Sequence, residues 1–422
     1  MATLVHDRLP EITGVCDRVA NGGQVAGATR RKFFEALEEA ARAGASDLHF
    51  TVGEPVALRV NSEIVKLEIP WDGEDVTHLW AGRFYQAARA GRVCEMALAR
   101  MQQPATPAVD FDTEYEVTAD NHRAATSLQL RVHVGRSRGI FTVSCRNFGS
   151  TIPSTRALGT PAEFCVLADG KGKGTGGLLL VCGPTGSGKS TTLAAVLQEV
   201  MARTRCKLIT CEDPIEYDIP SGRGIVQQRA LGPGLDVETL PEAIKSALRD
   251  DPDLIMFGEL RHPAEIVEAL KAAATGHLVF GTLHTGSAAQ TLSRFGLEDA
   301  FTSQMAAQHL RGVLCQKLLM RADGKGRIAA YELMKVNHAI RGQIQESRTQ
   351  QIRASIAQGH ADGMFTFARY LAEMVFESAV TADVACDVVG DHAAEYAQHL
   401  KYLRETKGKG PRVFIPADRP SP

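Results

Sequence analysis

Residues 183–190 read G-x-x-x-x-G-K-S, within the longer stretch GLLLVCGPTGSGKSTTLAAVL. The apolar run Leu178–Cys182 precedes this pattern, and a segment rich in alanine and leucine follows it. A phosphate-binding loop requires this strand–loop–helix context, because its glycines let the backbone N–H groups turn inward around a polyphosphate. The positive end of the following helix stabilises the same anion. A glycine-rich turn between a core strand and a core helix is the alternative, but such a turn needs neither the lysine nor the serine.

This pattern predicts a nucleoside triphosphate site with ATP and Mg²⁺ as cofactors. Lys189 is expected to reach the β- and γ-phosphates, and the Ser190 hydroxyl is expected to ligate the metal. The predicted nucleotide-binding residues are Gly183, Pro184, Thr185, Gly186, Ser187, Gly188, Lys189, Ser190 and Thr191.

The bulk composition is that of a globular chain with two or three domains, at roughly 150 residues per domain. With a formal net charge of −2, the 422 residues give no support to bulk binding of nucleic acid or anionic membrane. The nine cysteines form no C-x-x-C pair, which argues against a zinc site and a disulfide framework. No signal peptide is apparent, and no apolar run approaches the ~20 residues of a membrane helix. These features predict a cytoplasmic protein.

Periodicity divides the chain into six segments. We expect a flexible leader over 1–30, an α+β domain over 31–150, a linker over 151–177, a phosphate-loop domain over 178–335, a helical subdomain over 336–390, and a partly disordered tail over 391–422. In the first domain a helix is expected near 31–43 and another over about 76–101, with strands at 48–52, 57–60, 111–117, 124–134 and 140–147.

In the second domain apolar strands alternate with helices. Strands are expected at 178–182, 207–211, 254–257 and 278–282, and helices at 191–204, 240–249 and 263–274. This order predicts a parallel sheet covered by helices on both faces. Helical patterns at 338–347, 349–358, 364–378 and 381–388 follow it.

Carboxylates follow one of these strands directly. Glu212, Asp213 and Glu216 come after the strand 207–211, at the edge where open α/β sheets bind their ligands. There they can hold magnesium or orient an attacking water. A solvated acidic turn is the alternative, and the neighbouring phosphate loop disfavours it.

A further carboxylate, Glu259, follows the apolar strand 254–257. Gly258 stands where many nucleotide hydrolases place a magnesium-holding aspartate, so Glu259 is our candidate for the residue that polarises the hydrolytic water, supplemented by Asp213 and Glu216. His284, after the strand 278–282, is a candidate contact of the γ-phosphate. His277, before that strand, is expected to brace a loop or a neighbouring subunit.

The segments GPTGSGKSTT, CEDPIEY, LRDDPDLIMFGELR and TGHLVFGTLHT together resemble the Walker A, Asp box, Walker B and His box motifs of the secretion-superfamily hexameric ATPases. Within that GspE/PulE superfamily the chain is most similar to the PilT-like pilus-retraction branch. The segment Ala45–His49 resembles the start of the family's N-terminal PAS-like domain, and 338–367 resembles its C-terminal helical part. The implied fold is α/β: a PAS-like α+β domain, then a RecA-like domain with a parallel sheet and a C-terminal helical extension.

The resemblance also implies an assembly and a task. It implies a homo-hexamer at the cytoplasmic face of the inner membrane, in which ATP hydrolysis swings the domains across the connector 150–177 and acts on a membrane platform protein. No direct contact with nucleic acid is expected. The residues it implies near the phosphates are Arg131, Arg138 and Arg146 from the first domain, and Arg249, Arg261 and Arg294 from the second.

Departures from the family pattern keep alternatives open. The four-cysteine zinc element of the secretion branch is absent, which disfavours type II secretion and pilus extension. His262 replaces an acid, the segment after Arg294 is shorter, and the leader and tail are atypical, so a conjugative or effector-secretion ATPase stays open. A RecA-like nucleic-acid motor is disfavoured by the acidic balance and 6% aromatic content. A regulatory scaffold that hydrolyses poorly is disfavoured by the intact Lys189, Glu216 and Glu259.

Overall fold

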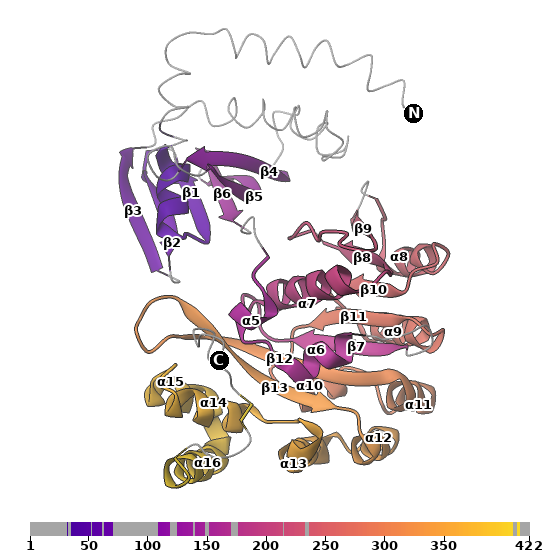
Figure 1. Cartoon of the computed structure of the whole chain (residues 1–422). Coiled ribbons are helices and arrows are strands. Elements are labelled where there is room, and N and C mark those ends of the chain that lie inside the picture. Colours follow the sequence, from indigo (N-terminus) through magenta and orange to yellow (C-terminus); the bar gives the residue numbers. More distant parts are fainter. Residues whose placement is uncertain are drawn as a thin grey trace. The chain divides into compact units, whose positions relative to one another are not determined.

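The computed structural model describes residues 32, 35–51, 53–60, 63–70, 109–118, 125–137, 140–147, 152–169, 176–213, 215–232, 236–407 and 412–413. The chain divides into two compact units, Met1–Thr151 and Ile152–Pro422 (Figure 1). The leader expected over 1–30 and the helix expected over 76–101 lie outside the described residues.

The first unit contains an antiparallel sheet in the order β3-β2-β1-β6-β5-β4. Its strands are β1 (Asp47–Thr51), β2 (Pro55–Val60), β3 (Glu63–Pro70), β4 (Val109–Thr118), β5 (Ala125–Ser137) and β6 (Ile140–Asn147). All of these except β3 were predicted from the sequence; β3 has little buried surface and only weak apolar alternation. The predicted α+β character of this unit is confirmed.

Alternation fixes which face of this sheet is buried. Leu48 and Phe50 of β1 are buried and lie opposite Cys145 and Val143 of β6, so one face carries a row of apolar pairs. The helix over 35–43 buries Ala36, Leu37 and Ala40 at helical spacing. These residues form a small core of the first unit.

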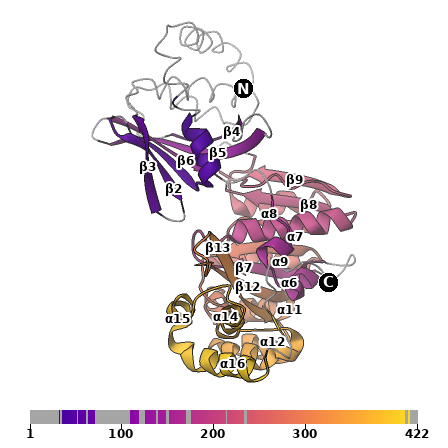
Figure 2. The ribbon, with the colours of Figure 1, turned by 60° about the vertical axis from the view of Figure 1, so that its left-hand side comes forward.

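The second unit contains a seven-stranded sheet in the order β13-β12-β7-β11-β10-β8-β9 (Figures 1 and 2). The strands are β7 (Gly177–Cys182), β8 (Lys207–Glu212), β9 (Ile225–Ala230), β10 (Leu254–Phe257), β11 (Leu278–Leu283), β12 (Leu310–Met320) and β13 (Arg327–Lys335). Six run parallel, and β13 at one edge is antiparallel to β12. The predicted α/β class is therefore confirmed, with a mainly parallel sheet.

The central strands are continuous apolar runs because helices cover both faces. Every residue of β7, β10 and β11 is buried, which is typical of a parallel sheet between two helical layers. Helices α5 (Thr155–Leu158), α6 (Ala162–Ala168) and α7 (Lys189–Arg203) pack together, and α8 (Leu240–Ala247), α9 (Pro263–Ala274) and α11 (Ala300–His309) form a second packed series.

Two parts of this sheet escaped the sequence analysis. The edge strand β9 has exposed residues and no apolar run, so its sequence resembles a loop. The strands β12 and β13 form a hairpin whose turn contains Gly324 and Gly326, both in the left-handed region with φ of 70° and 78°. This hairpin extends the sheet beyond β7.

The segment expected to be a linker is part of the second unit over 152–169. Phe164 and Ala168 of α6 are fully buried in its core. Thr155 donates both its backbone N–H and its hydroxyl to Glu199 Oε1 of α7, at 3.1 and 2.6 Å. A linker free to bend is therefore not found here, because 152–169 is anchored to the helix that follows the phosphate loop.

The helical subdomain belongs to the same compact unit. It comprises α12 (His338–Gln345), α13 (Ile352–Gln358), α14 (Phe367–Phe376), α15 (Ala382–Val389) and α16 (Ala393–Glu405), and it gathers beside the β13 edge of the sheet (Figures 1 and 2). Helix α16 lies in the region expected to be a partly disordered tail. It is ordered because Tyr396, Leu400 and Leu403 share one buried face that packs on α14.

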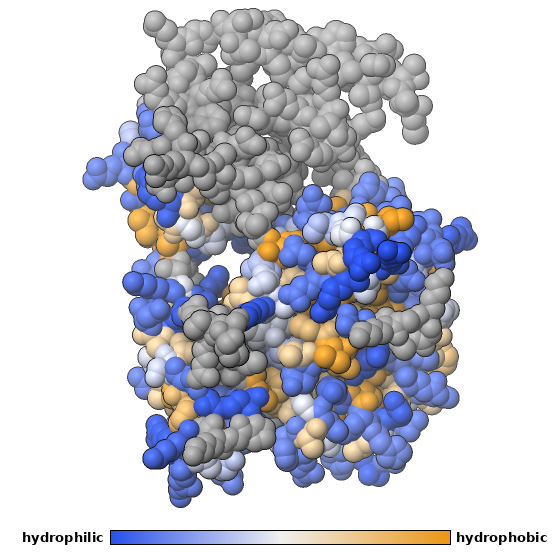
Figure 3. All heavy atoms as spheres, viewed as in Figure 1, coloured by the Kyte–Doolittle hydropathy of each residue, from blue (hydrophilic) through white to orange (hydrophobic). Residues whose placement is uncertain are grey.

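The visible surface of the second unit is mainly hydrophilic, with small separate apolar areas (Figure 3). Within the part of the chain that the structure describes, none of the helices combines the length and the apolar composition that crossing a bilayer requires.

Replacing Phe164 by alanine tests whether residues 152–169 form part of the core of the second unit. Removing a fully buried phenyl ring leaves a cavity, so the free energy of unfolding of the second unit should fall by about 3–5 kcal/mol. The urea midpoint of the full chain, followed by far-UV circular dichroism, measures this. The matched control is Val166→Ala on the same helix, whose side chain is 74% exposed and whose loss should change the unfolding free energy by about 0.5 kcal/mol or less. Equal midpoints for the two variants would contradict the placement of this segment in the core.

Candidate nucleotide-binding site

The predicted phosphate loop joins β7 to α7. Gly183 follows β7, and Gly188 caps the N-terminus of α7 in the left-handed region with φ of 84°. A side chain at Gly183 could not fit, because its Cβ would lie 2.3 Å from the Gln316 carbonyl oxygen of β12. The glycines thus serve two needs, a left-handed turn and a close approach to the neighbouring strand.

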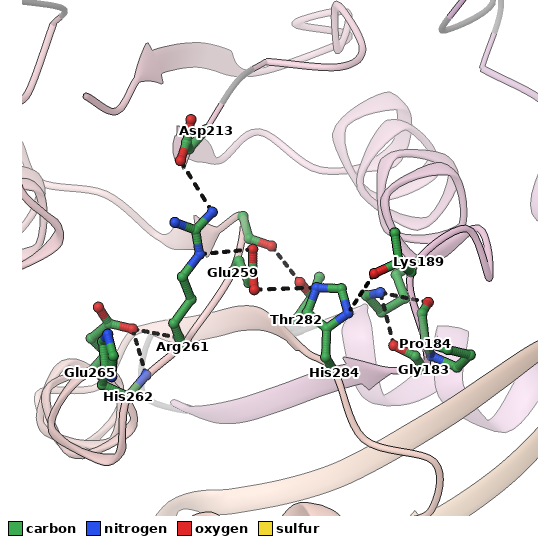
Figure 4. A network of polar contacts seen from close by, with 12 residues as sticks. Gly183, Pro184, Lys189, Asp213, Glu259, Arg261, His262, Glu265, Thr282 and His284 are labelled. Carbon is green, nitrogen blue, oxygen red and sulfur yellow. Dashed lines mark hydrogen bonds and ion pairs between the residues drawn. The ribbon is translucent and has the colours of Figure 1, made fainter. Parts of the chain in front are cut away.

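Lys189 folds back over this loop. Its Nζ donates to the carbonyl oxygens of Gly183 and Pro184 at 2.9 and 3.1 Å, and the residue is only 8% exposed (Figure 4). Burial lowers the pKa of Lys189, while Glu259 and Glu216 oppose that shift by favouring the charged form. The structure therefore holds a cation inside a loop of backbone dipoles.

Two other loop residues contact neighbouring elements. Thr185 Oγ1 lies 3.4 Å from His284 Nδ1, and Thr191 Oγ1 lies 2.8 Å from the Tyr217 hydroxyl. Ser190 stands in the first turn of α7, directly after the lysine. The loop is thus fixed against the segments that follow β8 and β11.

Three strand ends bring carboxylates and a histidine to the same edge of the sheet. Glu212 ends β8, Glu259 follows β10 by two residues, and His284 directly follows β11. Because these strands are parallel and adjacent, their carboxyl ends meet where the phosphate loop leaves β7.

Glu259 is the centre of a polar network (Figure 4). Its Oε2 accepts from Arg261 Nε at 3.0 Å, and its Oε1 lies 3.2 Å from His284 Nε2. Arg261 also donates from Nη2 to Asp213 Oδ2 at 3.2 Å. Both oxygens of the Glu259 carboxylate are therefore held, and 29% of the side chain is exposed to solvent. A carboxylate fixed in orientation but open to solvent can accept a proton from water.

Gly258 has a packing reason to lack a side chain. A Cβ at this position would lie 3.2 Å from Glu212 Cα, closer than most contacts of this kind. Its N–H donates to the Cys211 carbonyl and its carbonyl accepts from the Thr282 hydroxyl, so it is bound on both sides by β8 and β11. The usual aspartate would crowd Glu212 here.

Glu212 is a more buried group than the sequence suggested. It is 6% exposed, and its Oε1 accepts from Thr210 Oγ1 at 2.6 Å and from Gln228 Nε2 at 3.0 Å. Burial raises the pKa of its carboxyl, an effect that these two hydrogen bonds oppose. Glu216 is half-buried, and its charge acts on both Lys189 and Glu212.

His284 is held in an environment that disfavours its charge. Its pKa is lowered first by burial and then by the positive charges of Lys189 and Arg261, while Glu259 acts in the opposite direction. The neutral imidazole can donate at one ring nitrogen and accept at the other, so it can bridge Glu259 and Thr185.

Other predicted residues lie away from this edge. Arg249 is exposed and lies before β10, at the amino ends of the strands, on the side of the sheet opposite the phosphate loop. Arg294 is exposed after α10 (Ala288–Ser293). His277 precedes β11 at the amino ends of the strands, with its Nδ1 2.8 Å from Thr275 Oγ1. Within this unit the structure does not bring these three to the phosphate loop.

The three arginines of the first unit are only partly described. Arg146 of β6 pairs with Asp47 Oδ1 at 3.0 Å and is 61% exposed. Arg131 of β5 lies directly across from Arg146 in the sheet register. Arg138 lies outside the described residues.

A cavity beside the loop was not foreseen. Its volume is about 160 Å³, and Gly188 and Thr191 form one wall. The residues that complete it are Ala157, Leu158, Gly159, Gln316, Leu318, Arg321, Arg327, Ile328 and Ala329. Apolar walls with a few polar groups are typical of small-molecule sites. These residues come from α5 and the β12–β13 hairpin, so no local sequence motif could reveal them.

Comparison with known proteins gives a consistent result. The family model described as "Type II/IV secretion system protein" matches residues 172–384. A "Type IV pilus retractation ATPase PilT" from Pseudomonas aeruginosa is 34% identical over 83% of this chain and 96% of its own length. A "Twitching motility protein" from Neisseria gonorrhoeae is 39% identical over 57% of this chain, which spans 64% of that protein.

The fold agrees with a solved relative. A crystal structure of the pilus retraction motor PilT with bound ADP superposes with a TM-score of 0.68 and 32% sequence identity, over 86% of this chain and 98% of that one. Together with the phosphate loop and the Glu259 network, these matches establish that the chain belongs to the type II/IV secretion system family and is a PilT-like nucleotide-binding ATPase.

Proposed function

We propose that this protein hydrolyses ATP in a magnesium-dependent reaction and uses the energy to drive pilus retraction. The single observation that carries the chemistry is that Lys189, inside the phosphate loop, and Glu259, after β10, lie on the same side of the sheet, where the charge of Glu259 acts on Lys189. The retraction task is supported by the names of its relatives, a pilus-retraction ATPase and a twitching-motility protein.

The loop residues would bind the triphosphate. The proposed contacts are the backbone N–H groups over Gly183–Thr191, with Lys189 on the β- and γ-phosphates. In this structure its ammonium donates hydrogen bonds to two carbonyl oxygens. On nucleotide binding it would donate instead to phosphate oxygens, which are stronger acceptors. The nucleoside would lie beside Gly188 and Thr191, and the cavity there, of about 160 Å³, would take part of it.

Magnesium would be held by oxygen donors. The Ser190 hydroxyl fits this metal, and the half-buried Glu216 is available on the same side of the sheet for water-mediated contacts. Glu212 is 6% exposed, so we do not propose it as a ligand. No group of three or more histidine, cysteine, aspartate or glutamate side chains forms a metal cage among the described residues, and Mg²⁺ bound through phosphates and waters needs none. When bound, the metal would neutralise charge on the phosphates.

Glu259 would position and deprotonate the attacking water. Arg261 and His284 hold its two oxygens, so the carboxylate is oriented before substrate arrives, which is how preorganisation lowers a barrier. Asp213 supports Arg261 from the other side. We propose His284 as the group that links Glu259 to the loop through Thr185, with Glu216 supplementing the acid.

Arginines from the first unit would complete the site. Arg131, Arg138 and Arg146 are proposed to stabilise charge on the phosphates, within one chain or across a homo-hexamer, together with Arg249 and Arg294 from neighbouring copies. For Arg146 this requires release of Asp47, and an exposed ion pair contributes only about 0–1 kcal/mol. The assembly would act on a platform protein at the cytoplasmic face of the inner membrane.

A gene deletion in the source organism tests whether this ATPase drives pilus retraction or another process. If the protein retracts pili, the deletion strain should keep surface pili but lose twitching movement. Unchanged pili with loss of DNA transfer or effector export would instead support the secretion alternative. ATPase activity of the purified protein that rises on addition of DNA would favour a nucleic-acid motor.

Replacing Glu259 by glutamine should stop turnover and keep nucleotide binding. The amide fills the same space but cannot take a proton, so kcat should fall by about 100-fold or more, whereas the Kd for ATP should change little. Steady-state phosphate release and calorimetric titration measure the two quantities. The control is Glu268→Gln, an exposed glutamate on α9 that pairs with Lys271, which should hydrolyse ATP at the wild-type rate. Undiminished hydrolysis by Glu259→Gln would overturn the assignment of the base.

Removing magnesium should abolish hydrolysis. Excess EDTA should stop phosphate release, and added Mg²⁺ should restore it. Ser190→Ala, which deletes the proposed hydroxyl ligand, should raise the Mg²⁺ concentration for half-maximal rate by about tenfold. The exposed Ser293→Ala serves as the control and should leave that concentration unchanged. A wild-type Mg²⁺ requirement in Ser190→Ala would exclude Ser190 as the ligand.

The pKa of His284 should lie below its ordinary value of about 6.5 in the nucleotide-free protein. Because the folded pKa is depressed, the neutral ring contributes stability that is fully present above the ordinary pKa, and that stability is lost as the pH falls from the ordinary pKa through the lower folded pKa. NMR of ¹³C-labelled histidine measures the titration. Lys189→Met removes a positive charge and should raise this pKa, whereas Glu259→Gln removes a negative charge and should lower it further. Shifts of the opposite sign would contradict the electrostatic assignment.

A further inference from the structure

Gln316 connects strand β12 to the phosphate loop. Its side chain is 2% exposed. Its Nε2 donates to the Ser187 carbonyl oxygen of the loop at 2.7 Å, and its Oε1 accepts from Thr192 Oγ1 of α7 at 2.8 Å. One buried amide therefore joins the loop, the first turns of the following helix and a strand that lies more than 120 residues further along the chain.

The orientation of this amide is set by its partners. The Ser187 carbonyl can only accept a hydrogen bond, so the amide nitrogen must face it. The reversed amide would place Oε1 against that carbonyl oxygen and leave two buried acceptors in contact, which is costly. The Thr192 hydroxyl then donates to the amide oxygen.

This hydrogen bond also orients the next N–H group. In a trans peptide the C=O and the N–H of one unit point in opposite directions. With the Ser187 carbonyl directed at β12, the Gly188 N–H points away from β12. Phosphate loops bind their ligand through N–H groups such as this one.

Two further features show that β12 specifies the shape of the loop. A Cβ on Gly188 would lie 3.0 Å from Gln316 Nε2, and a Cβ on Gly183 would lie 2.3 Å from the Gln316 carbonyl oxygen. The Ser187 hydroxyl is buried and makes no hydrogen bond within the described part of the chain, so the carbonyl is the group that fixes this peptide.

We propose that Gln316 is a positioning residue for nucleotide binding, which presets the Gly188 N–H toward the β-phosphate. This inference rests on the proposed function, because it assigns a cause for the geometry of that same site. It predicts that Gln316 acts equally on ADP and ATP, since both carry a β-phosphate, and that its effect falls on binding rather than on the chemical step.

Gln316→Met keeps the length and burial of the side chain and removes both hydrogen bonds. The Kd for ADP, measured by calorimetry, should rise about tenfold, which corresponds to about 1.4 kcal/mol. The KM for ATP should rise by a similar factor, whereas kcat should change less than about threefold, as expected for a contact that is equal in ground and transition states. In the nucleotide-free protein, hydrogen exchange of the amides over 183–190 should be faster.

Thr192→Val is the matched control. It deletes only the bond from Thr192, in an equally buried position, and keeps the bond to Ser187. Its Kd for ADP and its loop exchange should therefore stay much closer to wild type than those of Gln316→Met. Equal losses in the two variants would show a general packing effect and overturn the proposal.

A second variant covers the case in which Gln316→Met does not fold. Gln316→Glu retains the acceptor for Thr192, but at pH 8 its carboxylate would face the Ser187 carbonyl, and protonation at low pH would restore a donor. Burial raises the pKa of such a carboxyl above its ordinary value of about 4.3, so the Kd of this variant for ADP relative to wild type should fall as the pH is lowered from 8 towards 5. A ratio that is independent of pH would contradict the role of the donor.

Failure of this inference and failure of the proposed function are distinguishable. If wild type binds ADP and Gln316→Met binds it equally well with unchanged KM, Gln316 is not a positioning residue and the ATPase assignment stands. If wild type binds no nucleotide, the proposed function itself fails.

Discussion

A lysine ammonium held among the carbonyl oxygens of a tight glycine loop is the interaction on which the site depends. Lys189 is buried, so its charge has lost most of its water, and among the described residues two backbone carbonyls accept hydrogen bonds from it. A polyphosphate supplies the negative charge that such a cation lacks. The loop must already be curled for this to work. Its shape depends on Gly183, which lies too close to β12 for a side chain, and on Gly188, whose backbone is left-handed.

The parallel sheet is the constraint that turns a binding loop into a reaction site. Adjacent parallel strands end at the same edge, so Glu212, Glu259 and His284 reach the loop although they are far apart in sequence. The polar network then crosses three strands: Arg261 joins the segments after β10 and β8, and His284 joins those after β10 and β11. A change at any one of these strand ends is transmitted to the Glu259 carboxylate.

Strand β13 and the C-terminal helix α14 are hydrogen-bonded to the segment that lines the cavity beside the phosphate loop. The Tyr331 hydroxyl of β13 donates to the Leu158 carbonyl at 3.1 Å, and the Tyr370 hydroxyl of α14 reaches the Gly159 carbonyl at 3.4 Å. Leu158 and Gly159 form a wall of the cavity beside the loop. Residues 152–169 are therefore anchored to the ATPase unit by these hydrogen bonds and by the buried side chains of α6.

The parts of this structure that could be predicted from sequence are those with a local physical signature. The central strands are unbroken apolar runs, and the loop glycines have fixed spacing, so both were found to within a few residues. Strand β9 lacks such a signature, because it has exposed residues and no apolar run. The hairpin β12–β13 was not predicted although it has two largely buried runs on either side of a glycine turn. Gln316 illustrates the limit: it is an ordinary polar residue in a strand, and only its partners on the loop and α7 reveal its role. Helix α16 was not predicted although Tyr396, Leu400 and Leu403 recur at helical spacing, because the charged, glycine- and proline-containing residues after it favoured disorder for the tail.

The most direct test of the central claim is calorimetric titration of Mg²⁺–ATP and Mg²⁺–ADP into the full-length protein and into Lys189→Ala. If a preformed loop and a buried ammonium hold the phosphates, the wild-type protein should bind both nucleotides at micromolar concentrations, and Lys189→Ala should lose affinity by about 100-fold or more while keeping the wild-type circular dichroism spectrum. Absence of binding to the wild-type protein, or equal affinity in the folded variant, would contradict the account.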